Sequence, residues 1–151
     1  MRLWQDPTMP EQGPLPLLSL ADEDGNAVRV EVSGPHPRWP KALAARIVVE
    51  SPFVRGSSDL AIWPANLQSL AVFLDQLAAG DDAMWLGNGR GPAIRIRLHG
   101  TRDCPDVEVE DEFVSMVTVV VPVALPDDWV GAQREHLAAV LATYRFVSGG
   151  G

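Results

Sequence analysis

The sequence has 151 residues, of which 46% are hydrophobic, and a formal net charge of −8. This length and apolar content suit a single globular domain and exclude a chain that is disordered throughout. The negative charge disfavours nucleic acid as a partner, because the phosphate backbone would repel it, and favours a basic protein. A net charge of this kind also serves solubility alone.

The chain has one cysteine, Cys104, so no intramolecular disulfide is possible, which is typical of a reducing compartment. The N-terminal residues carry acids and no apolar run, unlike a signal peptide, and no stretch has the length and apolarity of a membrane span. We therefore expect a cytoplasmic protein that does not contact membranes. The organisation predicted is a Pro-rich arm at 1–16, one α+β domain at 17–146 and a flexible tail at 147–151.

The first half of the domain predicts strands, since its apolar residues form short or alternating runs separated by Gly and Pro. The turn at Asp24, Gly25 and Asn26 joins the first two runs, and Ser51 with Pro52 joins the last two. The predicted strands cover residues 15–21, 27–33, 43–50 and 53–62, with a Pro-rich loop at 34–40.

The apolar period then changes to that of a helix over residues 64–79, which begins at Pro64 and stops at Gly80. Strands are predicted again at 83–86, 93–99, 106–110 and 114–124. A second helix is expected to follow Asp127, a suitable N-cap, and to run to about residue 145.

The connections between predicted strands are short, which favours antiparallel neighbours. We expect an α+β fold with one curved antiparallel sheet of about seven or eight strands and two α-helices packed on one face. No internal sequence repeat is visible.

The glycines at 87, 89 and 91 resemble a phosphate-binding loop, but such a loop leads into a helix. Here the following residues alternate as a strand, so a hairpin turn is the better interpretation. The strand's basic face holds Arg95, Arg97 and His99, and we expect it to meet acids of the next strand across the ladder. Similar local pairing is expected for Arg29 with Glu31 and for Arg55 with Asp59.

An acidic segment at 103–112 supplies the candidate residues for binding a partner protein. Val107 and Val109 alternate with its acids, which indicates a strand rather than a calcium loop. The segment is therefore either a solvated strand face or an acidic patch for a basic partner. The candidates are Asp103, Asp106, Glu108, Glu110, Asp111 and Glu112.

An alternative ligand cleft is expected beside the loop at 34–41, where irregular backbone and a local cluster of basic residues coincide. Its candidate residues are His36, Arg38 and Trp39, with Arg90 from the glycine loop.

No catalytic residue, cofactor or metal site is predicted. The histidines at 36, 99 and 136 lack the spacing of a metal site. Cys104 lies beside Asp103, which would disfavour a reactive thiolate. The serines at 51, 57 and 58 lack the context of a nucleophile.

The order of elements over about residues 25–145 carries a family resemblance, centred on Phe53-Val54-Arg55-Gly56 and on the helix segment with Phe73. In this order the chain resembles a group of small bacterial proteins that are similar to WapI-type immunity proteins, which are thought to neutralise a co-encoded secreted toxin. The resemblance implies an immunity-type protein without a catalytic motif.

From these observations we expect a non-catalytic protein-binding domain, monomeric or homodimeric, whose partner is a protein such as a basic toxin. The alternative is a small-molecule-binding protein or minor enzyme that uses the cleft beside residues 34–41.

Overall fold

The computed structural model describes residues 13–87 and 91–144, and it confirms the predicted α+β class. Its elements follow one another as β1 (Leu15–Ala21), β2 (Ala27–Pro35), β3 (Leu43–Glu50), β4 (Arg55–Ile62), α1 (Pro64–Ala78), β5 (Ala83–Trp85), β6 (Ala93–Arg97), β7 (Asp106–Asp111), β8 (Val117–Pro122) and α2 (Trp129–Thr143). Within the described residues, neither helix is long and apolar enough to cross a membrane.

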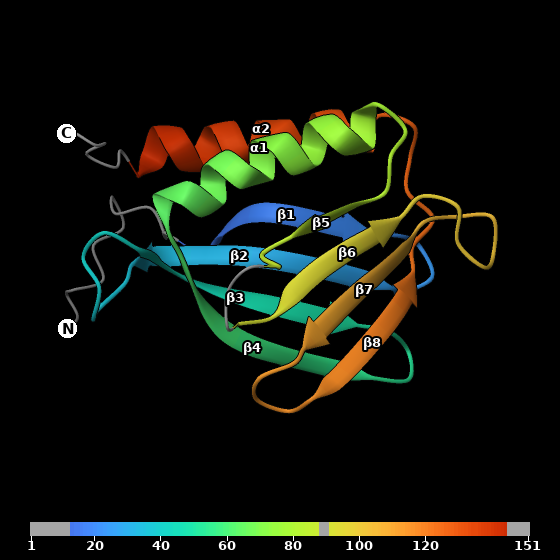
Figure 1. Cartoon of the computed structure of the whole chain (residues 1–151), viewed down its shortest axis with the longest axis horizontal. Coiled ribbons are helices and arrows are strands. Elements are labelled where there is room, and N and C mark those ends of the chain that lie inside the picture. Colours follow the sequence, from blue (N-terminus) through green and yellow to red (C-terminus); the bar gives the residue numbers. More distant parts are fainter. Residues whose placement is uncertain (1–12, 88–90, 145–151) are drawn as a thin grey trace, which may run out of the picture.

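The strands form two antiparallel four-stranded sheets, β1-β2-β3-β4 and β5-β6-β7-β8 (Figure 1). This differs from the expected single curved sheet. The strands divide because α1 follows β4 and carries the chain to the start of the second sheet, so β4 and β5 do not pair. The order of four strands followed by one helix therefore occurs twice in the chain, although the two halves show no visible sequence repeat.

The core lies between the two sheets and under the helices. Strand alternation supplies it, because every second side chain of a strand faces the same side. Val28, Val30 and Val32 of β2 and Ile94 and Ile96 of β6 are all fully buried. One continuous cluster contains these residues together with the apolar faces of both helices. The inward faces predicted from the alternating pattern are thus confirmed.

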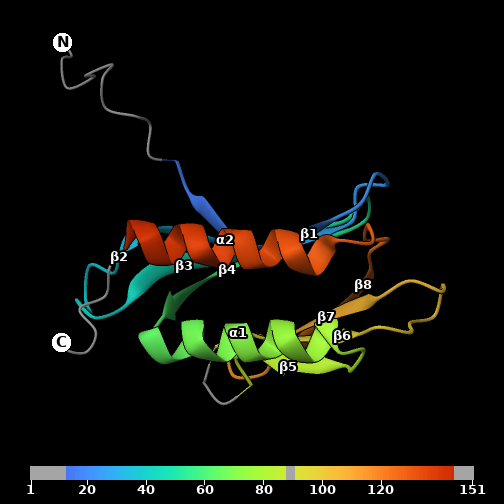
Figure 2. The same ribbon diagram turned by 90° about the horizontal axis from the view of Figure 1, so that it is seen from above.

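Each helix packs against the sheet from the other half of the chain. Helix α1 follows the first sheet in the chain but contacts the second, and helix α2 follows the second sheet but contacts the first. Helix α1 lies against β5 and α2, and helix α2 lies against β1. Seen from above, the two helices run side by side across the top of the sheets (Figure 2). The Trp85 indole Nε1 donates to the Asn66 carbonyl oxygen at 2.9 Å, which ties β5 to α1.

A buried side chain of α2 closes the outer edge of β1. Gln133, 3% exposed, accepts a hydrogen bond from the Ser19 N–H at 2.8 Å and donates from Nε2 to the Ser19 carbonyl at 3.0 Å. The same nitrogen donates to the Trp129 carbonyl at 3.2 Å. The Gln133 amide thus serves Ser19 as a neighbouring strand would, and it covers an edge that could otherwise pair with another chain.

The helix starts agree with the predictions in one case and not in the other. Helix α1 begins at Pro64 as predicted, and the Asn66 Oδ1 accepts from the Trp63 N–H at 2.8 Å. The predicted N-cap Asp127 is wrong, because the helix begins one residue later and its cap residue is Asp128, without a side-chain cap bond.

The ends of the chain are described in part. The first strand begins at Leu15, so the last two residues of the predicted arm belong to the first sheet. The rest of the arm up to residue 12, the glycine-loop residues 88–90 and the predicted tail at 147–151 lie outside the described residues. The predicted hairpin itself is confirmed, since β5 and β6 pair antiparallel.

Replacing Gln133 by leucine should destabilise the fold. The Q133L variant leaves the part-buried N–H and C=O of Ser19 without these partners, which costs about 1–3 kcal/mol of unfolding free energy. Urea denaturation measures this change. The control is Q68L on the exposed face of α1, which should leave the unfolding free energy within about 0.5 kcal/mol of the original. Equal effects of the two substitutions would contradict the role of Gln133.

Candidate functional site

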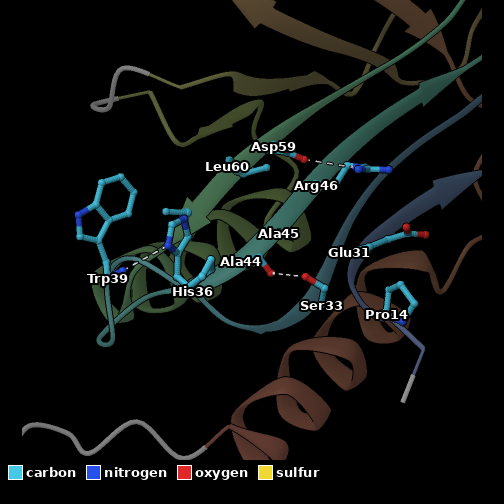
Figure 3. A pocket seen from close by; sticks show the side chains of 12 residues that line it. Pro14, Glu31, Ser33, His36, Trp39, Ala44, Ala45, Arg46, Asp59 and Leu60 are labelled. Atoms are coloured by element: carbon cyan, nitrogen blue, oxygen red, sulfur yellow. Dashed lines mark hydrogen bonds and ion pairs between the residues drawn. The ribbon is translucent and has the colours of Figure 1, made fainter. Parts of the chain in front are cut away.

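A pocket of about 580 Å³ lies against the first sheet, beside the loop after β2 (Figure 3). Ala44 and Arg46 of β3 alternate with the buried Leu43 and Ala45, so this is the outer face of the sheet. The pocket is lined by Pro14, Glu31, Ser33, His36, Pro37, Trp39, Ala44, Ala45, Arg46, Asp59, Leu60 and Ala61.

Two of the residues predicted for a ligand cleft, His36 and Trp39, line this pocket. Their loop is held by His36 Nδ1, which accepts hydrogen bonds from the backbone N–H of Arg38 at 3.0 Å and of Trp39 at 3.3 Å. The rings of His36 and Trp39 stack with centroids 4.6 Å apart, and Trp63 lies 6.0 Å from Trp39. Trp63 was not among the candidates from the sequence, because it is 24 positions from Trp39 in the chain and joins the cluster only through the fold.

Of the other two cleft candidates, Arg38 does not line the pocket among the described residues. The Arg38 guanidinium lies 5.7 Å from the Trp39 ring centroid, and Arg90 lies outside the described residues. The carboxylates at the pocket pair with arginines, Glu31 with Arg29 and Asp59 with Arg46, each at 3.5 Å. A ligand cleft at this place stays a prediction.

The acidic candidates divide into those used by the fold and those that face solvent. Glu108, with a side chain 12% exposed, lies 3.8 Å from Arg95 Nε and 3.6 Å from Arg97 Nη2. Arg95 is also its register partner across the β6–β7 ladder, so the predicted charge-balanced sheet face is confirmed. Asp106 is 8% exposed and accepts from the Thr101 hydroxyl at 3.2 Å.

The β7–β8 turn uses another of these acids. Asp111 Oδ2 accepts from the Ser115 N–H at 3.1 Å and from its hydroxyl at 2.8 Å. Of the remaining candidates, Asp103 and Glu112 are exposed and Glu110 is half-buried. Asp103 precedes β7 and Glu112 follows it, so the six acids do not gather into one patch. A partner-binding role for them stays a prediction.

The strongest exposed feature of the second sheet is apolar and was missed from the sequence. The predicted strand at 114–124 begins only at Val117, and the residues before it form a turn in which the Met116 N–H donates to the Asp111 carbonyl at 2.8 Å. An apolar stretch inside a turn was the available signal. We call the exposed residues of this region the hairpin surface: Phe113, Val114, Met116, Val117 and Val120.

The described residues include no cluster of side chains suited to holding a metal ion, because no three or more His, Cys, Asp or Glu residues gather there in a suitable arrangement. Cys104 is half-buried in the loop before β7.

A family model matches residues 15–145, from the first residue of β1 to two residues beyond α2. The chain belongs to DUF5959, a family of unknown function. No curated protein and no solved structure matches it. The match spans both sheets and both helices, so the hairpin surface of this DUF5959 protein lies within the family's domain. The family description assigns no activity, and the resemblance to WapI-type immunity proteins stays a prediction.

The buried Asp106 depends on a glycine beside it. A Cβ added to Gly100 would lie 2.5 Å from the Asp106 carboxyl group and from the Cys104 carbonyl oxygen. Gly100 also donates its N–H to that same carbonyl at 3.1 Å. The loop before β7 therefore has no room for a side chain at this position.

The G100A variant of this DUF5959 protein should lose roughly 1–3 kcal/mol of unfolding free energy, because the added methyl forces the loop away from Asp106. The matched control is G131A in α2, where a Cβ meets open space and alanine favours the helix by about 0.5–1 kcal/mol. Urea denaturation compares the two. A G100A variant as stable as the original would contradict the close approach.

Proposed function

We propose that this DUF5959 protein is a non-catalytic binding protein that holds a partner protein on its hairpin surface. The observation that supports this is the exposure of five large apolar residues along one turn and one strand. Large exposed apolar residues concentrated in one hairpin are typical of interaction sites in soluble proteins. Strand β8, which carries part of this surface, is also the last strand of its sheet, and its outer backbone N–H and C=O groups can bind an extended segment of a partner.

The chemistry of the partner follows from the residues around the hairpin surface. Glu110 and Glu112 stand next to it in the chain, and β8 itself carries no charge. The whole chain has a net charge of −8. The matching partner therefore presents apolar side chains with a basic border, and opposite charges accelerate its association.

Two of the ionisable side chains beside the hairpin surface are already bound to other groups of the fold, which favours a binding role over a catalytic one. Asp111 is engaged by Ser115, and Glu108 is engaged by Arg95 and Arg97. These carboxylates hold the β7–β8 region in shape and are committed to the fold. The immunity-type role, with a basic toxin as the partner, is the specific form of this proposal, and the sequence resemblance supports it.

Substitution of Val117 by aspartate should weaken the partner complex. The V117D variant places a charge within the hairpin surface, for which about tenfold weaker binding is typical. The matched control is V72D on α1, since both valines are 54% exposed. Biolayer interferometry against the purified products of the adjacent genes measures both variants.

The same measurement at two salt concentrations tests the charge term. Raising the ionic strength should slow association with a basic partner, because the long-range attraction is screened. Equal losses for V117D and V72D would contradict the proposed surface. Failure of every adjacent gene product to bind would contradict the partner.

A further inference from the structure

The last strand of the first sheet, β4, is a second open edge. It pairs with β3 over its whole length, and no other described strand pairs with it. Both β4 and β8 lie on the side of the molecule away from the two helices (Figure 1). Unlike β8, β4 is polar and carries two opposite charges, Arg55 and Asp59.

These two charges do not pair within the chain, which corrects the pairing expected from the sequence. On an extended strand their Cα atoms are separated by about 13 Å, too far for an ion pair. Asp59 instead lies 3.5 Å from Arg46 Nε, and its side chain remains 86% exposed.

Arg55 is left without an acidic partner among the described residues. Its register partner across the ladder is Glu50. The Glu50 carboxylate is already engaged, because Arg29 Nη2 donates to its Oε1 at 2.7 Å. Arg55 therefore remains available for an acid supplied from outside the chain, and the 86% exposed Asp59 side chain can accept a second cation besides Arg46.

We propose that β4 pairs antiparallel with β4 of a second copy of this chain about a two-fold axis through Ser57. Arg55 and Asp59 stand two positions before and two positions after Ser57, on the same face of the strand. An antiparallel register centred on Ser57 places Arg55 of each copy directly opposite Asp59 of the other. Two ion pairs then form, with Cβ atoms about 4.5–5.5 Å apart.

The strand is built to match itself. Its charges sum to zero, so the net charge of −8 on each chain is not concentrated at the contact. Gly56, Ser57 and Ser58 place only small side chains at the centre, where two backbones approach most closely. The first sheets of the two copies then form one continuous eight-stranded sheet, and neither copy keeps an open edge at β4.

Two charge reversals test the pairing. In R55E each copy brings glutamate against Asp59, and in D59R each copy brings arginine against Arg55. Each variant alone should dimerise about tenfold more weakly than the original chain, because like charges directly opposite destabilise a strand pair. An equimolar mixture should regain the dimer, since both cross-strand pairs are then opposite in sign. Sedimentation equilibrium measures the dissociation constants, and thermal unfolding confirms that each variant is folded.

A cross-link tests the register. In a C104S background, S57C places two thiols opposite each other on the two-fold axis, at a Cα separation that suits a disulfide. Oxidation should convert this variant to a covalent dimer, whereas the control S69C on the exposed side of α1 should not cross-link efficiently. A chain that stays monomeric at high micromolar concentration would overturn the proposal. A dimer that survives both R55E and D59R, or cross-links equally at both positions, would overturn it as well.

Discussion

The structure depends on how the outer edges of two sheets are covered. A four-stranded antiparallel sheet has two edges with unpaired backbone groups, and an open edge invites pairing with other chains. In this protein each helix covers the first strand of the sheet that it does not follow. At β1 the cover is specific, because the Gln133 amide satisfies both backbone groups of Ser19. At β5 the Trp85 indole bonds to α1.

This exchange of helices joins the two halves of the chain. Neither half holds its own helix against its own first strand, so the two sheets share one core. A consequence is that all helical cover is on one side. The edges of β4 and β8 lie on the opposite side. The β4 edge is polar and carries two charges that can pair with those of a second copy, whereas the β8 edge is apolar. The proposed interactions follow from that asymmetry.

Much of the fold could be predicted because alternation and helical spacing are local signals. The bounds of β1 and β3 and the start of α1 at Pro64 agree with the sequence, as does the pairing of Arg95 with Glu108. The division into two sheets could not be predicted, since it depends on which strands pair across α1. The start of β8 was placed too early because Val114 and Met116 are apolar but belong to a turn, which is also why the hairpin surface was missed.

The most direct test of this account is the amide hydrogen exchange of Ser19, measured by NMR at neutral pH. If Gln133 closes the edge of β1, the Ser19 amide is hydrogen-bonded and should exchange as slowly as the paired amides of the central strands β2 and β3. The opening free energy obtained from its exchange rate should then approach the free energy of global unfolding. Exchange of the Ser19 amide at the rate of an unprotected peptide would contradict the account, because β1 would then be an open edge and α2 would not seal it.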